Sequence, residues 1–343
     1  MPRLPALALL AALAFILMLA AWPVPPPPHK VRASITEQSD PDLYRAINRR
    51  VAAGESYYRV TADELRKGGY PLKPFVTFRL PTLAMLNAFL PTLAATLAPA
   101  ALVLTLLIMW WRRLEPQVPL PLLAVGLILI VGGSVASASP ITLLFHESWA
   151  ALLLALMIGL RRPGRVAMAI LAGASALALR ETVLPMILVM GTLAAIERRW
   201  NEAAGWLAIV ALFALGLFAH AYMVASVVRP DDLASPGWGA TLGFRFALDA
   251  IARVSSATML PNGLAAIALI LSLFGWLSVA TGWALRTSLL LLGYGTMLAL
   301  FARADTFYWA LLVAPLSLAG LTFVPRAITT LVHASRGMAQ RPA

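Results

Sequence analysis

The sequence predicts an all-α, polytopic integral membrane protein with about ten transmembrane helices. Hydrophobic residues make up 60% of the 343 residues, charged residues make up 12%, and the mean hydropathy is +0.81. Apolar runs of about 20 residues, the length that crosses a bilayer, recur between short basic clusters. This composition excludes a soluble enzyme and indicates a single transmembrane domain over residues 1–343.

The first predicted span is Leu4–Trp22, which follows a lone Arg3. Such a segment is either a cleaved signal peptide or a retained span. We expect retention because the apolar part is longer than the core of an ordinary signal peptide, with cleavage after Ala20-Ala21 as the alternative. Prolines 23–28 end the helix, since proline lacks the N–H that a helix needs and favours extended polyproline geometry.

The first extracytoplasmic loop, residues 23–80, is the long polar segment of the chain and predicts two short helices along the bilayer surface. Asp40 is placed to cap the first helix, with Pro41 at the first helical position. Leu43, Ile47 and Val51 then recur at i, i+4 and i+8. This spacing gives one apolar stripe, which is typical of a helix that lies in the interface.

Glycines and a capping pattern set the remaining boundaries of the polar loops. Gly54 ends the first helix, the capping-box spacing of residues 61–64 predicts the start of the second, and Gly68-Gly69 ends it.

The second extracytoplasmic loop, residues 228–259, predicts an amphipathic helix over residues 241–257 that could cover a site as a lid. Arg245, Asp249 and Arg253 recur there every four residues, a spacing that stabilises an exposed helix.

The other spans are predicted from apolar runs near residues 82–110, 119–138, 142–160, 166–180, 183–197, 204–227, 260–281, 284–302 and 307–324. The two runs that flank Arg180-Glu181 are too short to cross a core of about 30 Å comfortably. We therefore expect broken or re-entrant helices there, shielded by protein. Arginines in the short loops and in the tail, residues 325–343, predict a cytoplasmic side that also carries both termini.

The charges and scarce residue types restrict the chemistry. The formal charge of +12 is spread over short loops, as membrane topology requires, so nucleic-acid binding is not expected. The chain has no cysteine, which excludes thiol catalysis and cysteine metal ligands. Its four histidines are far apart in the sequence. Acids on the outer face could bind a divalent cation, but their spacing specifies none, so no cofactor is assigned.

Most acidic residues are predicted to lie on the outer face, several of them at span ends. The pairs at span ends are His146-Glu147, Arg180-Glu181, and Arg303 with Asp305. Ionisable residues at membrane depth are costly and mark a site or pathway. The alternative is that Arg180 and Glu181 pair with other residues only to hold helices together.

The loop that begins at Asp40 resembles a family of membrane enzymes. Asp40 is followed by Tyr44 four residues later, then by a helix that ends at Gly54, and Lys73-Pro74-Phe75 lies just before the second span. This pattern resembles the glycosyltransferase C superfamily, especially its protein O-mannosyltransferase and lipid A aminoarabinose transferase branch. Phe75 stands where the branch has a second proline.

The resemblance implies transfer of a sugar from a polyprenyl-phosphate donor to a glycan, lipid or protein acceptor at the outer face of a bacterial cytoplasmic membrane. Asp40 would be the general base of an inverting displacement, although Asp42 stays open as the base because the branch often has Asp-Glu at this point. The leaving phosphate needs cations. The residues expected at this substrate site are Lys73, Arg79, Arg180, Glu181, Arg245 and Arg303, with Tyr44, His146, Glu147 and Asp305 as further candidates.

Other functions fit parts of the same pattern. A transporter or flippase for a lipid-linked sugar would also use broken helices and charges at span ends, but it needs a polar path to the cytoplasmic half. A noncatalytic membrane subunit would tolerate loss of Asp40. Asp40 could also be a plain helix cap, and Lys73 and Arg79 could anchor the second span by snorkelling to the head groups.

Overall fold

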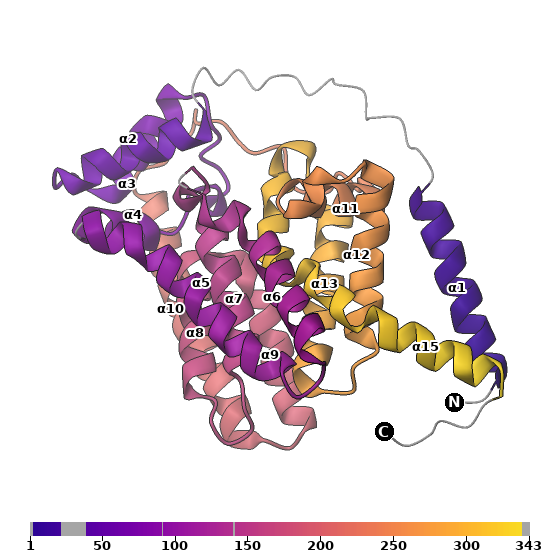
Figure 1. The fold of residues 1–343 in the computed structure, drawn as a ribbon. Helices are drawn as coiled ribbons and strands as arrows, with labels where there is room; N and C mark the ends of the chain where they lie inside the picture. Colours follow the sequence, from indigo (N-terminus) through magenta and orange to yellow (C-terminus); the bar gives the residue numbers. More distant parts are fainter. Residues whose placement is uncertain (1–2, 22–38, 91, 140, 338–343) are drawn as a thin grey trace. The chain divides into compact units, whose positions relative to one another are not determined.

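The computed structural model describes residues 3–21, 39–90, 92–139 and 141–337, and the regular structure of these residues is helical (Figure 1). The predicted all-α class is therefore confirmed. The proline run at residues 23–28 and the last six residues of the predicted tail lie outside the described residues. Contacts between Cα atoms group the chain into two compact units, each made of several segments.

Unit 1 comprises residues 1–27, 107–135 and 240–343. In this unit α1 packs on α12 and α15, α11 packs on α12 and α13, and α12 packs on the helical turns around Gly320. Its elements are α1 (Arg3–Ala21), the end of α5 (Thr92–Leu114), α6 (Leu120–Ser134), α11 (Gly243–Arg253), η5 (Ser256–Met259), α12 (Asn262–Leu277), α13 (Gly282–Phe301), η6 (Ala304–Val313), α14 (Ala314–Ser317), η7 (Ala319–Phe323) and α15 (Val324–Ser335).

The core of unit 1 has an aromatic cluster and close backbone crossings. Trp276 contacts Trp110 and Phe323, with ring centroids 5.5 and 5.4 Å apart. Gly320 lies against α12, where its backbone N–H donates a 3.0 Å hydrogen bond to Ser272 Oγ. A Cβ at Gly320 would lie 2.0 Å from the Ser272 carbonyl oxygen. Glycine is therefore needed for this crossing, because any side chain would displace backbone.

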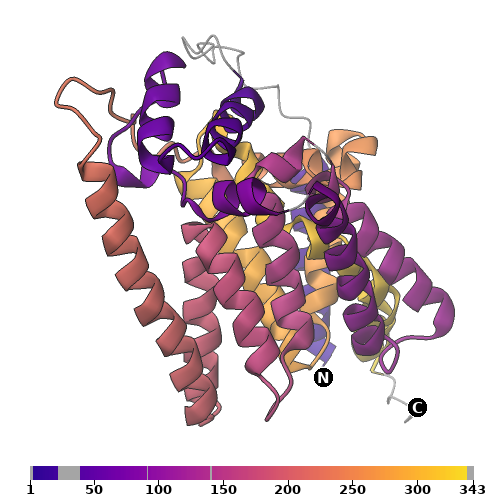
Figure 2. The same cartoon turned by 90° about the vertical axis from the view of Figure 1, so that its left-hand side faces the viewer.

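Unit 2 comprises residues 28–106 and 136–239. Figure 2 shows α2 and α3 at the same end of this unit as the C-terminal end of α10. Among the longer helices, α7 packs on α8 and α9 packs on α10. Its elements are α2 (Asp40–Ala52), α3 (Tyr57–Lys67), η1 (Phe75–Thr77), α4 (Thr82–Phe89), the start of α5, η2 (Ala136–Ala138), η3 (Thr142–Leu144), α7 (His146–Leu160), α8 (Ala167–Leu179), η4 (Glu181–Val183), α9 (Leu184–Ile196) and α10 (Trp200–Ala225).

Five helices among the described residues are long and apolar enough to cross a membrane, which indicates an integral membrane protein. They cover Arg3–Ala21, Leu97–Leu114, Trp200–Ala225, Gly282–Phe301 and Ala304–Ser335. Shorter apolar helices lie between them, at Phe75–Phe89, Leu120–Ser134, His146–Leu160, Ala167–Leu179, Glu181–Ile196 and Asn262–Leu277. The two short runs predicted on either side of Arg180-Glu181 are α8 and α9, each of 13 residues.

Several predicted boundaries are wrong. The span predicted over residues 82–110 is two helices, α4 and α5, and Leu90 between them is extended, as the residue before a proline prefers. The lid helix predicted over residues 241–257 is shorter, since α11 ends at Arg253 and a separate 3₁₀ turn follows. The span predicted over residues 307–324 is a series of short helical turns that continues into α15.

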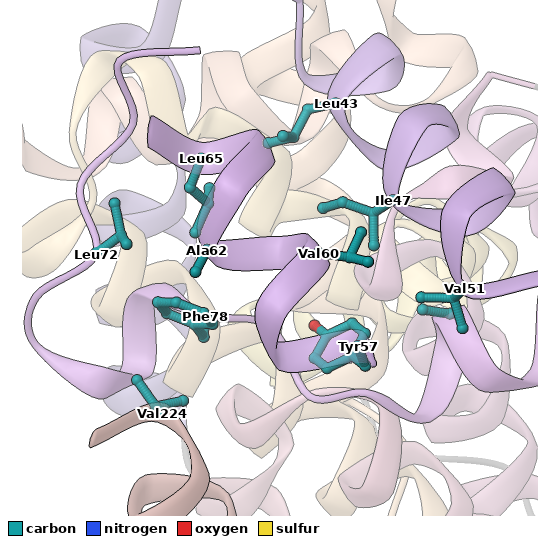
Figure 3. Close-up of a cluster of buried hydrophobic side chains, with 11 residues drawn as sticks. Leu43, Ile47, Val51, Tyr57, Val60, Ala62, Leu65, Leu72, Phe78 and Val224 are labelled. Carbon is teal, nitrogen blue, oxygen red and sulfur yellow. The ribbon is translucent and has the colours of Figure 1, made fainter. Parts of the chain in front are cut away.

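The outer-loop helices cover each other instead of leaving their apolar faces for lipid. The predicted stripe of Leu43, Ile47 and Val51 is buried, as expected, and Figure 3 shows it facing side chains of α3 such as Val60 and Leu65. We call this the outer-loop core, which consists of Leu43, Ile47, Val51, Tyr57, Val60, Ala62, Leu65, Leu72, Phe78, Ala84 and Val224. The amphipathic pattern therefore serves tertiary packing between the loop and the end of α10.

The helix boundaries in this loop differ from the prediction at two points. The second helix begins at Tyr57, four residues before the predicted capping box, so Thr61 is an interior residue. Ser39, and not Asp40, occupies the N-cap position of α2. The predicted C-terminal ends are confirmed, because Gly54 and Gly69 have φ values of +91° and +68°, which favour glycine.

The second extracytoplasmic loop is tied to the first by charged and backbone hydrogen bonds. Arg66 donates to both oxygens of Asp232, from Nε at 2.7 Å and from Nη2 at 2.8 Å, and also to the Val227 carbonyl oxygen. The backbone of Leu72 donates to Leu233 at 2.8 Å, and Ser235 donates to Lys73. The hydrogen bonds from Arg66 lower the pKa of Asp232 to about 2.

We expect Asp232→Asn to release residues 229–235 from the first loop at pH 7. In the parent, the ion pair between Arg66 and Asp232 is fully formed above pH 3.8, the ordinary pKa of an aspartate, and is lost as the pH falls toward 2. Because the pKa of Asp232 is lowered in the folded state, this ion pair stabilises the fold only while the carboxylate is ionised. Hydrogen exchange of the backbone amides of residues 229–235 measures this release. Asp231→Asn, at the exposed neighbouring position, is the control and should leave exchange unchanged; equal exchange in both variants would contradict the prediction.

Candidate functional site

The start of α2 separates the two candidate bases. Ser39 Oγ donates a 2.6 Å hydrogen bond to Asp42 Oδ2, and Arg45 Nη1 donates to Oδ1 at 2.8 Å. The hydrogen bond from Ser39 lowers the pKa of Asp42, so this exposed carboxylate is a weaker base. Asp40 lies one residue inside the helix, and its Oδ1 accepts a 2.8 Å hydrogen bond from Tyr70 Oη. Asp40 is therefore not the helix cap that the sequence predicts.

One turn after Asp40, Tyr44 connects α2 to the start of α7. Its ring meets the rings of Phe145 and His146 edge-on, with centroids 5.8 and 5.9 Å apart. Its hydroxyl oxygen accepts a 3.3 Å hydrogen bond from Arg79 Nε. Burial raises the pKa of Tyr44, and the charge of Arg79 opposes this shift only in part. The phenol is therefore neutral at physiological pH and can both donate and accept a hydrogen bond.

Next to Tyr44 lies a buried group of charges. Arg180 Nε lies 2.7 Å from Glu147 Oε1, and both side chains are 1% exposed. Arg180 also pairs with Glu181, which begins the turn η4. Glu147 interacts electrostatically with Arg79 and His146 as well. We call Tyr44, Arg79, His146, Glu147, Arg180 and Glu181 the charged cluster.

The cluster brings together six of the residues predicted for the site, with Asp40 beside it, since Asp40 interacts electrostatically with Tyr44. The guanidinium of Arg180, one of the cations expected at the substrate site, is matched by two carboxylates. Breaking a buried ion pair is costly because it leaves an uncompensated charge. The pairing of Arg180 with Glu147 and Glu181 is the arrangement expected if these residues hold helices together.

Other predicted site residues make their contacts elsewhere. Lys73 Nζ donates a 2.9 Å hydrogen bond to the Pro230 carbonyl oxygen in the second loop. Three of the predicted site residues, Arg245, Arg303 and Asp305, belong to unit 1 and form ion pairs there. Arg245 Nε lies 3.2 Å from Asp249 Oδ1, as the predicted helix face requires, and Arg303 Nη2 lies 3.0 Å from Asp305 Oδ2.

An apolar groove in unit 2 runs along α10 and has a volume of about 410 Å³. On α10 it extends from Ile209 to Met223, about 21 Å at 1.5 Å per residue. Its walls are mostly apolar residues of α8 and α10, among them Ala174, Leu177, Ala178, Leu212, Phe213 and Gly216. A chain of methylene or isoprene units suits such a surface, because apolar area leaves water in proportion to contact.

Tyr58 and His220 are the most polar residues of the apolar groove. Tyr58 Oη lies 3.2 Å from His220 Nδ1, and the His220 ring also contacts Phe75. His220 interacts electrostatically with Glu181 of the charged cluster. The apolar groove and the charged cluster therefore belong to one unit, and His220 of the groove lies close enough to Glu181 for an electrostatic interaction.

Sequence reasoning missed Tyr70, Tyr58 and the apolar groove. Tyr70 follows Gly68-Gly69, and nothing in its spacing from Asp40 signals a contact across 30 positions.

Among the described residues, no group of three or more His, Cys, Asp and Glu side chains is arranged to hold a metal ion. No family model, curated protein or solved structure gives a significant match to the chain.

Proposed function

We propose that this protein is a membrane glycosyltransferase that moves a sugar from a polyprenyl-phosphate donor to an acceptor hydroxyl. One observation supports the proposal: unit 2 combines a carboxylate that does not cap its helix with an apolar groove, and His220 of this groove interacts electrostatically with Glu181 of the charged cluster. The apolar groove suits the hydrocarbon chain of the donor, and Asp40 is available as a base. The resemblance of the Asp40 loop to the glycosyltransferase C superfamily agrees with this combination.

In the proposed reaction, Asp40 accepts the proton of the acceptor hydroxyl while the acceptor oxygen forms a bond to the anomeric carbon. The bond between that carbon and the phosphate oxygen breaks, and its electron pair leaves with the phosphate. This single displacement inverts the anomeric configuration. The departing polyprenyl phosphate carries the negative charge, so it needs a cation and not a protonated acid.

Among the cations, Arg79 is the first candidate for the phosphate in this proposal. It donates to Tyr44 and interacts electrostatically with Glu147, which places it at the charged cluster. Arg180 is better explained as the residue that joins α7 to η4, since two carboxylates already match its charge. Lys73, Arg245 and Arg303 remain further candidates for contacts with the substrate.

The proposal includes the membrane arrangement that the sequence predicts. The chain would cross a bacterial cytoplasmic membrane about ten times, with both termini in the cytoplasm and the reaction at the outer face. The acceptor would be a glycan, a lipid or a protein. The rival functions are a transporter of lipid-linked sugars and a noncatalytic subunit, and the extensive pairing of charges in the charged cluster would suit the latter.

Asp40→Asn tests the proposal because it removes the base and keeps the size of the side chain. We expect the transfer rate to fall about 10²- to 10⁴-fold, the range for a positioned general base. Purified protein in nanodiscs would be incubated with undecaprenyl-phosphate hexoses and pentoses as donors, together with glycan, lipid and protein acceptors, and release of undecaprenyl phosphate would be measured. Asp42→Asn is the matched control two residues away and should retain most of the rate. Transfer at the parent rate by folded Asp40→Asn would refute the mechanism.

A further inference from the structure

Tyr70 is held at the end of α3 by a glycine-dependent cap. The backbone N–H of Tyr70 donates a 2.8 Å hydrogen bond to the Leu65 carbonyl oxygen, and that of Gly69 donates to Arg66 at 3.1 Å. With Gly69 at a φ of +68°, these two bonds form a Schellman motif, which satisfies the last carbonyl groups of the helix. The backbone of Tyr70 is therefore fixed by the sequence Gly68-Gly69 that ends α3.

The side chain of Tyr70 is fixed as well. It is partly buried and packs against the outer-loop core. Its hydroxyl group then donates the 2.8 Å hydrogen bond to Asp40 Oδ1. Asp40 is thus held by a residue that both a backbone cap and hydrophobic packing keep in place, and this hydrogen bond joins the end of α3 to the start of α2.

We infer that Tyr70 is a positioning residue that holds the Asp40 carboxylate in the orientation needed for proton transfer. This inference rests on the proposed function. With Oδ1 bonded to Tyr70, Oδ2 is the oxygen that takes the acceptor proton as the bond from the acceptor oxygen to the sugar forms. Tyr70 keeps its own proton and contacts no reacting atom. Its effect is geometric, since a base is effective only within a narrow range of distance and angle.

A purely structural role predicts a different outcome for the loss of the hydroxyl group. If the Tyr70 hydrogen bond only joined α2 to α3, its loss would lower stability and leave turnover by the folded protein unchanged. If it orients Asp40, turnover falls while binding of both substrates is kept, because the interaction matters in the transition state. The effect must also disappear when Asp40 can no longer accept a proton.

Tyr70→Phe is therefore compared with the parent, with Asp40→Asn and with the double variant. We expect Tyr70→Phe to lower kcat about 10- to 100-fold with KM for donor and acceptor changed less than twofold. In the Asp40→Asn background, Tyr70→Phe should cause no further loss. Tyr70→Phe keeps the ring and removes only the hydroxyl group, which separates the hydrogen bond from packing. Asp232→Asn is the control that loosens the same loops without touching Asp40, and it should keep kcat.

The outcomes separate this inference from the proposed function. If Asp40→Asn transfers sugar at the parent rate, the proposed mechanism fails. If Asp40→Asn is slow but Tyr70→Phe retains the parent kcat, the positioning role alone is refuted. Equal loss from Tyr70→Phe in the parent and Asp40→Asn backgrounds refutes it too, because the two residues would then act independently. Melting temperatures of all variants establish that the measured protein is folded.

Discussion

Arg180→Met is expected to destabilise the protein by about 3–5 kcal/mol, the usual cost of removing one partner of a buried ion pair. The substitution leaves Glu147 buried, at 1% exposure, without the guanidinium 2.7 Å away. A carboxylate removed from water in this way loses its hydration and keeps only the weaker electrostatic interactions with Arg79 and His146. Reversible unfolding in mixed detergent and SDS micelles measures the free energy of unfolding.

Two further variants serve as controls for the loss of stability in Arg180→Met. Replacing both buried partners, in Glu147→Leu with Arg180→Met, should recover part of the stability, because the fully buried carboxylate is removed and only the partly exposed Glu181 loses its partner. Arg45→Met breaks an exposed pair, whose side chains are 49% and 57% accessible, and should cost less than about 1 kcal/mol. If Arg180→Met costs no more than Arg45→Met, the buried pair does not hold the helices together, and Arg180 becomes a candidate for binding the phosphate again.

Gly320→Ala is expected to cost about 3 kcal/mol or more, at the upper end of the range for overpacked cores. The added Cβ would lie 2.0 Å from the Ser272 carbonyl oxygen and 2.7 Å from the Trp276 ring. A backbone oxygen cannot rotate away as a side chain can, so α12 and η7 must separate. The same unfolding measurement detects the loss, and weakened packing around Trp276 should also shift the tryptophan fluorescence.

Gly293→Ala is the matched control in α13. Apart from its chain neighbours and the backbone of its own helix, no heavy atom lies within 4 Å of a Cβ built at Gly293. Alanine also has the higher helix propensity by about 1 kcal/mol. This variant should therefore be neutral or slightly more stable. Equal loss of stability in the two variants would show that helix flexibility, and not the close crossing at Gly320, explains the effect.

Features that depend on local composition and period could be read from the sequence. The short helices on either side of Arg180-Glu181 lie within a few residues of their predicted limits, because hydropathy marks each apolar run independently of its neighbours. The burial of Leu43, Ile47 and Val51 follows from the helical period in the same way. The capping role of Asp40 was wrong, because Ser39 and Asp40 both suit a helix start and side-chain preference alone does not choose between neighbours.

The sequence by itself indicated an integral membrane protein, since 60% of its residues are hydrophobic and many of them form long runs. It also indicated the helical class, because a helix satisfies every backbone hydrogen bond within one continuous apolar segment. Tertiary structure alone decided which charges pair between separate helices and where Asp40 points. Tyr70 is hydrogen-bonded to Asp40, which is 30 positions away in the sequence, and Arg180 forms an ion pair with Glu147, which is 33 positions away. No local pattern encodes such contacts, because they form only when separate helices pack and bring their side chains within hydrogen-bonding distance.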